Sequence, residues 1–234
     1  MSISFAKHQL RALAPLLVVM LLVVPALAAT PPRPKGAVAP TSLLQKLREL
    51  MDLNQPIATG GSRGGDTHYV CVINPRVERQ SIGDAIGLVL LGSPTLVVVN
   101  PLNEVQIERD NRLAWQKLAS SSQPIIGPIP WPLAPIQADE TVTLRLRPQG
   151  ASGADFANIT LKGAPAKTLE ANSVLVKSLG TKPEVWLSGI NQQLDQTRSS
   201  LALALLFSPE APNVVVLNDL RRQLTVRGCG DKKE

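Results

Sequence analysis

Cysteine and histidine have the most specific chemistry among the residues of this chain, and both are scarce. Beyond Ala28 there are two cysteines, Cys71 and Cys229, and one histidine, His68. A structural zinc site needs three or four ligands; His68 and Cys71 supply two, with Cys229 as the one further candidate. The N-terminus indicates export, as argued below, and an even cysteine count in an exported chain favours a disulfide. We therefore predict a Cys71–Cys229 disulfide, with two free thiols as the main alternative, and we expect no metal and no cofactor.

The single histidine also limits nucleophilic catalysis, which needs a base beside the nucleophile. Asp66, Thr67 and His68 offer an acid, a hydroxyl and an imidazole in three successive residues. Neighbouring residues of a strand point to opposite faces, so these three cannot form a triad by themselves. We interpret them as a polar approach to a strand.

Paired carboxylates are the remaining route to catalysis, because glycoside hydrolysis needs two of them roughly 5–9 Å apart. Asp139 or Glu140, beside Trp131, is the location that we favour for such a pair. Sites for sugars and small molecules also rely on aromatic walls, yet the chain beyond Ala28 has three Trp, one Tyr and two Phe. This aliphatic composition favours a binding or structural protein over an enzyme. The other carboxylates that we considered are Glu104, Glu108, Asp110 and Asp155.

The N-terminal segment 1–28 has the pattern of a secretory signal peptide. Lys7 and Arg11 precede an apolar run over 12–24, and Ala26-Leu27-Ala28 forms an A-x-A cleavage site. A bilayer span needs about 20 apolar residues, more than this run contains. We therefore predict cleavage after Ala28 and a secreted or periplasmic location. The alternative is a retained anchor, and we expect membrane contact only in that case.

The basic residues are spread along the chain rather than clustered. The formal net charge is +6, from 24 basic and 18 acidic residues. A nucleic-acid surface needs a basic stripe with aromatic side chains interleaved, and the sequence has none. We therefore expect no nucleic-acid partner.

Between the signal peptide and the first strands we predict a linker over 29–59 with one amphipathic helix over 41–54. Its apolar residues form a single stripe, which packs either on its own domain, the interpretation we prefer, or on a membrane or a partner. The glycine-rich stretch 60–65 lacks the Gly-Lys-Ser/Thr ending of a phosphate-binding loop. We interpret it as a connector.

The fold class that we predict is α+β, with an antiparallel β-sandwich over 60–165 followed by a small helical segment over 166–234. Short β-rich runs separated by Gly and Pro turns indicate the sandwich, and 141–147 (TVTLRLR) shows the clearest alternation. Asn100 to Asn103 has the composition of a turn. Helical runs follow over 168–179, 183–194, 198–207 and 214–224, although Val214 to Val216 has strong β propensity.

The stretch from Ile125 to Pro135 is unusually rich in proline, with four prolines along it. Proline cannot donate to a central ladder, so the stretch must form an edge or cross over the sheet. Trp131 either plugs one end of the β core, covering side chains such as Val142 and Leu144, or forms a recognition surface with Pro132 and Pro135. We prefer the core interpretation and keep the surface as a candidate site.

Three stretches carry a resemblance to a known group: GGSRGG at 60–65, SPTLVVVNP at 93–101, and WPLAPIQADETVTLRLRP at 131–148, which leads into GASGADFANI. From about residue 60 onward the chain resembles cyanobacterial secreted envelope proteins that contain a domain of unknown function. This resemblance implies an envelope location and no known activity.

These observations together predict a non-enzymatic envelope module that binds or assembles with another protein, which we expect to be a further envelope protein. The alternative is a hydrolase of cell wall or polysaccharide that uses an unidentified carboxylate pair.

Overall fold

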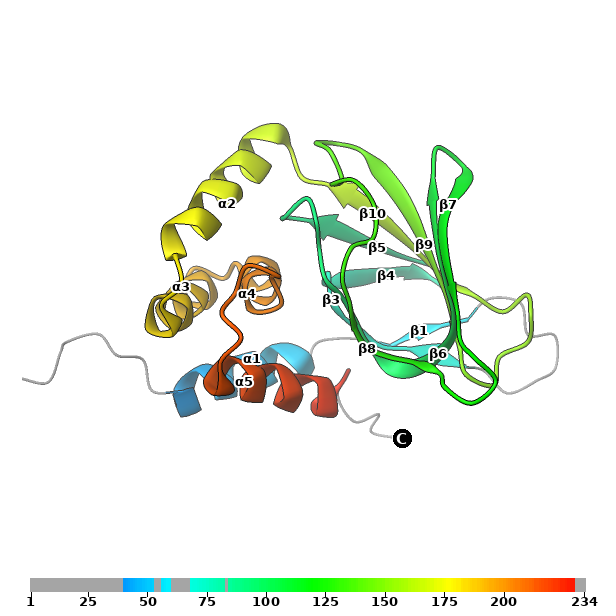
Figure 1. Cartoon of the computed structure of the whole chain (residues 1–234), viewed down its shortest axis with the longest axis horizontal. Coiled ribbons are helices and arrows are strands. Elements are labelled where there is room, and N and C mark those ends of the chain that lie inside the picture. The colour runs from blue at the N-terminus through cyan, green and yellow to red at the C-terminus, as the bar shows by residue number, and fades with distance from the viewer. Residues whose placement is uncertain (1–39, 53–55, 60–67, 83, 230–234) are drawn as a thin grey trace, which may run out of the picture. The chain divides into compact units, whose positions relative to one another are not determined.

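The computed structural model describes residues 40–52, 56–59, 68–82 and 84–229 (Figure 1). The predicted signal peptide, residues 29–39 and 53–55 of the linker, and the glycine-rich stretch lie outside these residues. The chain from Gly36 to Glu234 forms one compact unit, so the sheet and the helices described below belong together. Among the described residues, every helix is too short or too polar to cross a membrane.

Most of the described chain between residues 57 and 163 is strand, and the chain from residue 166 onward is mostly helix. The elements in chain order are α1 (Pro40–Asp52), β1 (Ile57–Ala58), β2 (Tyr69–Val70), β3 (Val72–Asn74), β4 (Val77–Ser81), β5 (Asp84–Val89), β6 (Leu96–Arg109), β7 (Arg112–Leu118), β8 (Ile125–Ile129), β9 (Thr141–Pro148), β10 (Ala157–Gly163), α2 (Ala166–Leu179), α3 (Pro183–Asp195), α4 (Ser199–Leu206) and α5 (Val215–Arg227).

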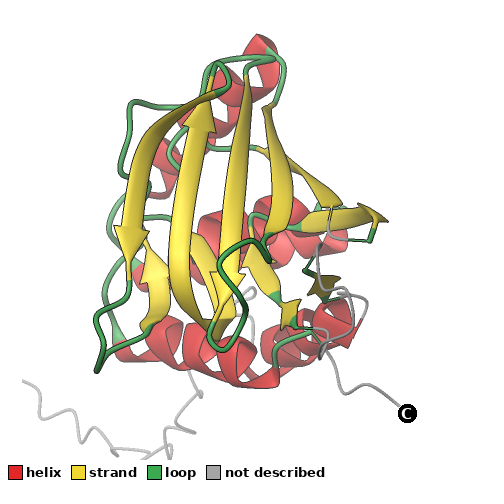
Figure 2. Ribbon diagram, turned by 90° about the vertical axis from the view of Figure 1, so that its right-hand side faces the viewer, coloured by secondary structure: helices red, strands yellow, loops and turns green. Residues whose placement is uncertain are grey.

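The α+β class is confirmed, whereas the antiparallel sandwich is not. A single eight-stranded sheet has the order β3-β6-β9-β10-β5-β4, and β7 and β8 also pair with β6. β10 and β5 run parallel, so the sheet is mixed. Figures 1 and 2 show that it curves strongly and nearly closes on itself, with the helices on one side. One curved sheet therefore surrounds its own core, where we had expected two sheets to face each other.

Strand β6 holds this sheet together because it pairs with four other strands. Its first part pairs with β3 and β8, and its second part with β7 and β9. The predicted turn at Asn100 to Asn103 is instead the middle of this strand. The register shifts between Leu102 and Glu104, so Pro101 lies next to an irregularity where a missing N–H is tolerated. The Asn100 side chain accepts a hydrogen bond from the backbone N–H of Cys71 at 2.8 Å.

The alternation predicted for β9 is present and directs apolar side chains into the sheet core. Val142, Leu144 and Leu146 are completely buried, while Arg145 and Arg147 point outward. We use the name sheet core for the buried side chains enclosed by the curved sheet, which are Ile57, Val70, Val72, Ala85, Val89, Leu96, Val98, Leu102, Val105, Ile107, Ile125, Ile129, Ile136, Val142, Leu144, Leu146, Ala157, Ile159 and Leu161.

The helices form a second apolar cluster, the helical core, around the fully buried Trp186. The indole Nε1 of Trp186 donates to the carbonyl of Gly180 at 2.8 Å, where α2 has just ended. α1 packs against α5 and α3 in this cluster, and its Leu43, Leu47 and Met51 are completely buried. The predicted amphipathic helix thus packs on its own domain. The other members of the helical core are Leu50, Cys71, Ile73, Val97, Val176, Leu179, Ile190, Leu201, Ala202, Leu203, Leu205, Leu206, Phe207, Ala211, Leu217, Leu220 and Leu224.

The disulfide ties the end of the helical segment to the sheet. Cys71 and Cys229 have Sγ atoms 2.05 Å apart and Cα atoms 5.7 Å apart, and bridged cysteines require a Cα distance of about 4.4–6.8 Å. The predicted pairing is therefore confirmed. Ile73 and Val97 also face the helical core rather than the sheet core, so the outer side of β3 and the start of β6 are covered by helices.

Candidate functional site

The proline-rich stretch divides into a strand and a crossing segment. β8 pairs antiparallel with the first part of β6, and Pro128 lies opposite Val97. Residues 130–140, which we call the proline segment, then connect β8 to β9 across the ends of other strands. The Ile136 N–H donates to the carbonyl of Gly92, just after β5, and the Asp139 N–H donates to the carbonyl of Gly163 at the end of β10. The prolines thus occupy an edge strand and a crossover, as predicted.

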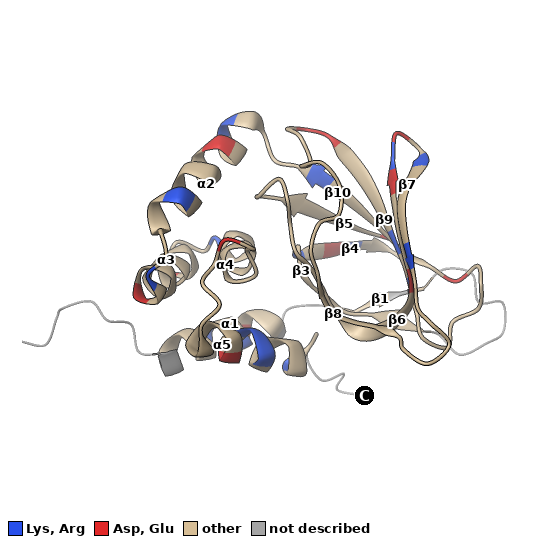
Figure 3. Ribbon diagram, viewed as in Figure 1, with Lys and Arg blue, Asp and Glu red and all other residues tan. Residues whose placement is uncertain are grey.

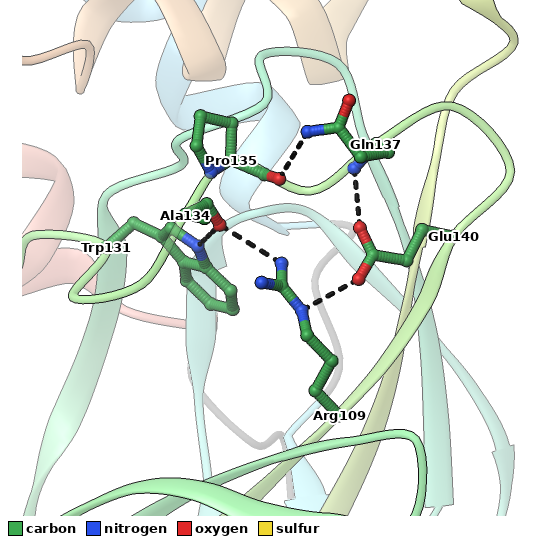
Figure 4. A network of polar contacts seen from close by, with 6 residues as sticks. All are labelled: Arg109, Trp131, Ala134, Pro135, Gln137 and Glu140. Carbon is green, nitrogen blue, oxygen red and sulfur yellow. Dashed lines mark hydrogen bonds and ion pairs between the residues drawn. The ribbon is translucent and has the colours of Figure 1, made fainter.

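A polar network fixes the middle of the proline segment (Figure 4). The carbonyl of Ala134 accepts hydrogen bonds from Trp131 Nε1 and from Arg109 Nη2, both at 3.0 Å. Arg109 Nε also lies 2.7 Å from a carboxylate oxygen of Glu140, and the other oxygen of Glu140 accepts from the backbone N–H of Gln137 at 2.7 Å. Arg109, the last residue of β6, therefore holds the middle and the C-terminal end of the segment in place.

Trp131 has features of both interpretations that we considered, a packing residue of the core and a part of a recognition surface. The side chain is partly buried and packs against the sheet core, the cluster that includes Val142 and Leu144. It is not enclosed as Trp186 is, and both Pro132 and Pro135 are exposed. Trp131 is thus anchored at the margin of the core with part of its surface accessible, next to two exposed prolines.

A groove of about 310 Å³ lies between the proline segment and α2. Its apolar lining comes from Pro135, Leu91, Leu169 and Val176, and its charged lining from Lys177 and Glu210. The candidate recognition surface, comprising Trp131, Pro132 and Pro135, is therefore continuous with an apolar hollow at Pro135.

Glycine at position 163 allows the proline segment to lie close to β10. A Cβ added to Gly163 would stand 1.9 Å from the backbone carbonyl oxygen of Gln137, much closer than any real contact. The main chains therefore approach each other at a distance that only glycine permits. The segment is therefore held at two places of the sheet: by close main-chain contact with β10, and by the polar network with the end of β6.

The candidate carboxylates other than Asp110 have polar or cationic partners. Glu108 pairs with Arg145, and Glu140 with Arg109. Asp139 lies 3.6 Å from Lys162 in an exposed pair, and Asp155 accepts from the hydroxyl of Ser152. Asp110 lies at the β6–β7 turn with a φ of 54°. Within the described ranges, His, Cys, Asp and Glu side chains do not gather in threes as a metal site requires.

Glu104 lies in a buried network of polar side chains that its position in the sequence did not indicate. It is 6% exposed and accepts hydrogen bonds from Gln106, Gln116 and both Nε and Nη2 of Arg147. Burial alone would raise the pKa of Glu104, but the hydrogen bonds from Gln116, Arg147 and Gln106 outweigh it and lower the pKa. A general acid needs a raised pKa. The pKa of Glu104 is lowered instead, so this carboxylate is not suited to that role.

The ring of Phe156 lies beside Arg147 of this network and beside Arg145. The guanidinium groups of Arg145 and Arg147 lie 4.5 Å and 5.8 Å from the ring centre of Phe156, a cation–π arrangement. One feature of the sequence pointed to these contacts. Glu104, Arg145 and Arg147 all lie at outward positions of strands in which apolar and polar residues alternate. Their pairing across β6 and β9 depended on a register that the sequence does not specify.

His68 lies just before β2, where its carbonyl accepts a hydrogen bond from the N–H of Thr59 at 2.9 Å. Its ring lies against Gly150, because a Cβ added there would stand 3.3 Å from Cε1 of His68. Asp66 and Thr67 lie outside the described residues. Both cysteines are in the disulfide, so neither supplies a thiolate to a nucleophilic or metal site.

Comparison with known proteins gives no matching family model, no matching curated protein and no matching solved structure. The resemblance to cyanobacterial envelope proteins thus stays a prediction.

Proposed function

We propose that this chain is an exported, non-enzymatic envelope protein that binds another protein through Trp131, Pro132, Pro135 and the adjoining groove. The observation that carries the proposal is the combination of rigidity and exposure at this place. The polar network of Arg109 and Glu140 holds the segment, while the two prolines remain exposed.

Such a surface suits protein recognition for a physical reason. Association loses binding energy when flexible loops must be ordered, and here the prolines and the hydrogen bonds of Ala134 have already ordered the backbone. Tryptophan is enriched among the residues that dominate binding energy. An anchored, partly exposed Trp131 would contribute contact area with little further loss of conformational entropy.

The groove indicates the chemistry of the partner. Leu91, Leu169 and Val176 form an apolar lining, and Lys177 and Glu210 bring one charge of each sign. We infer that the partner presents an extended apolar segment of another exported protein, with polar groups that fit between these two charges. The disulfide is compatible with the export that the N-terminal sequence predicts.

Site-specific cross-linking in the cells that make the protein tests this function. A photo-reactive amino acid replaces Pro132 or Pro135, and the matched control carries it at Pro101, an exposed proline in β6 outside the segment. We expect one discrete cross-linked protein from positions 132 and 135 and none from position 101. Equal cross-linking at all three positions, or none at 132 and 135, would contradict the proposal.

The hydrolase alternative is tested on the same protein. We expect purified protein to leave peptidoglycan, glycans and ester substrates unchanged. Turnover that disappears in Asp139→Asn or Glu140→Gln would overturn the binding function and establish an enzyme.

A further inference from the structure

The net positive charge beyond Ala28 comes from two short segments, because acidic residues balance the basic ones elsewhere. Residues 68–164, which hold the curved sheet, carry eight basic and eight acidic side chains. α5 carries three arginines and one aspartate, and residues 29–39 carry Arg33, Lys35 and no acidic side chain. Beyond Ala28 there are 22 basic and 18 acidic residues, and these two segments account for the whole excess.

α5 lies beside α1, the helix that follows residues 29–39 in the sequence. α1 begins at Pro40, directly after residues 29–39, and packs against α5. Arg48 of α1 donates to the side-chain oxygen of Gln223 of α5 at 2.8 Å. Figure 3 shows Lys and Arg positions on α5 beside α1. Arg33 and Lys35 precede α1 in the sequence, and α1 itself packs against the basic helix α5.

Three arginines surround a shallow hollow on this face. Arg48, Arg222 and Arg227 line it together with Gln223 and Val226, and its volume is about 610 Å³. All three arginines are exposed. Arg222 also pairs with Asp219 at 2.8 Å.

Two valines of α5 also point into solvent, and one of them, Val226, lines the hollow. Val215 and Val226 are 76% and 82% exposed, and with Arg222 they occupy the stripe of α5 opposite its buried leucines. Exposed arginines beside an exposed apolar side chain suit contact with the interface of an anionic bilayer. An acidic protein would be complementary to the arginines but would not explain the two valines.

We propose that the face formed by Arg48, Arg222, Arg227 and Val226 binds the headgroups of anionic phospholipids. This contact does not require a retained signal peptide and is separate from the surface around Trp131. A fully extended chain advances only about 3.5 Å per residue, and few residues separate Ala28 from Pro40. A signal sequence held in the bilayer during export would therefore keep this face near the membrane surface.

Vesicle flotation tests the proposal with the chain from Ala29 onward, which contains the entire compact unit. The probes are vesicles of phosphatidylcholine alone and vesicles with about 30% phosphatidylglycerol, at about 50 and 300 mM salt. The test variant is the triple change Arg48→Gln, Arg222→Gln, Arg227→Gln. The matched control removes three exposed charges elsewhere, with the changes Arg79→Gln, Lys167→Gln and Lys182→Gln.

We expect the unchanged protein to float with anionic vesicles and not with neutral ones, and to bind more weakly at high salt. The triple arginine variant should bind roughly 100-fold more weakly, about fivefold for each charge, while the control retains binding. If the triple variant does not fold, Gln223→Glu, which adds one negative charge to the hollow, should weaken binding severalfold. No binding to anionic vesicles, or equal binding by the arginine variants and the control, would overturn the proposal and favour an acidic protein as the occupant.

Discussion

Replacing Glu104 by glutamine should destabilise the protein far more than the same change at Glu108. Both residues lie on the outer face of β6, and each pairs with an arginine of β9. They differ in burial. The side chains of Glu104 and Arg147 are 8% and 20% exposed, whereas those of Glu108 and Arg145 are 28% and 35% exposed.

The magnitude follows from what each substitution leaves behind. Removing one partner of a buried ion pair costs about 3–5 kcal/mol because the other charge remains buried. Glutamine retains one acceptor oxygen for Arg147, so we expect about 3 kcal/mol for Glu104→Gln. A partly exposed surface pair contributes about 0–1 kcal/mol, so Glu108→Gln should cost less than about 1 kcal/mol.

Urea unfolding followed by far-ultraviolet circular dichroism measures both values. The dependence of the unfolding free energy on urea concentration should be the same in the two variants, because neither changes the surface that unfolding exposes. Equal losses in the two variants would refute the argument that burial of the Glu104–Arg147 pair determines its contribution.

The pH dependence gives a second check on Glu104. Its pKa is lowered in the folded protein, so its contribution is complete above the pKa of an unfolded glutamate, about 4.3. That contribution is lost as pH falls below this value and through the folded pKa. The difference in stability between the unchanged protein and Glu104→Gln should therefore narrow below about pH 4.3 and stay constant above about pH 6.

Three further predictions concern the disulfide, the proline segment and export. Changing both Cys71 and Cys229 to serine opens a loop that spans 158 positions and should cost up to about 5 kcal/mol on a chain-entropy basis; thiol labelling of the unreduced, unfolded protein should find no free thiol. Gly163→Ala should cost about 3 kcal/mol because its Cβ meets a backbone oxygen at 1.9 Å, whereas Gly153→Ala, with nothing within 4 Å, should be nearly neutral in the same unfolding assay. The mass of the exported protein should match a chain that begins at Ala29, and an intact segment 1–28 would instead indicate a membrane tether.

Local patterns predicted the elements that depend on short stretches of sequence. The alternation of Val142, Leu144 and Leu146 identified a strand with one buried face, and Gly180 marked the end of α2. Around Val214 the sequence indicated both strand and helix. Val214 itself has an extended backbone, and helix α5 starts at the next residue, Val215. The cysteine count and the predicted export were enough to predict the disulfide.

Arrangements that depend on distant pairing were not predictable. The parallel pairing of β5 with β10 joins Asp84 to Asn158, and no local pattern specifies a partner so far along the chain. For this reason the mixed, curved sheet was mistaken for an antiparallel sandwich. The turn composition of Asn100 and Pro101 was also misleading, because a register shift in β6 accommodates both.

In the candidate site, too, local features were predictable from the sequence and long-range contacts were not. Composition placed Trp131, Pro132 and Pro135 at an edge or crossover, which is where they lie. The role of Arg109 could not be predicted, because its contacts with Ala134 and Glu140 join segments that come together only through the fold.

The central claim is that Trp131 is held in place in order to bind a partner, and Trp131→Ala tests it most directly. Unfolding free energy and cross-linking from position 132 are measured on the same variant, with Trp186→Ala as the stability reference for a fully buried tryptophan. Because Trp131 is only partly buried, we predict a loss of less than about 2 kcal/mol for Trp131→Ala, against about 4 kcal/mol for Trp186→Ala, together with loss of the cross-linked partner. A loss of about 3–5 kcal/mol for Trp131→Ala with the cross-link retained would show that Trp131 serves the core and would contradict the proposed function.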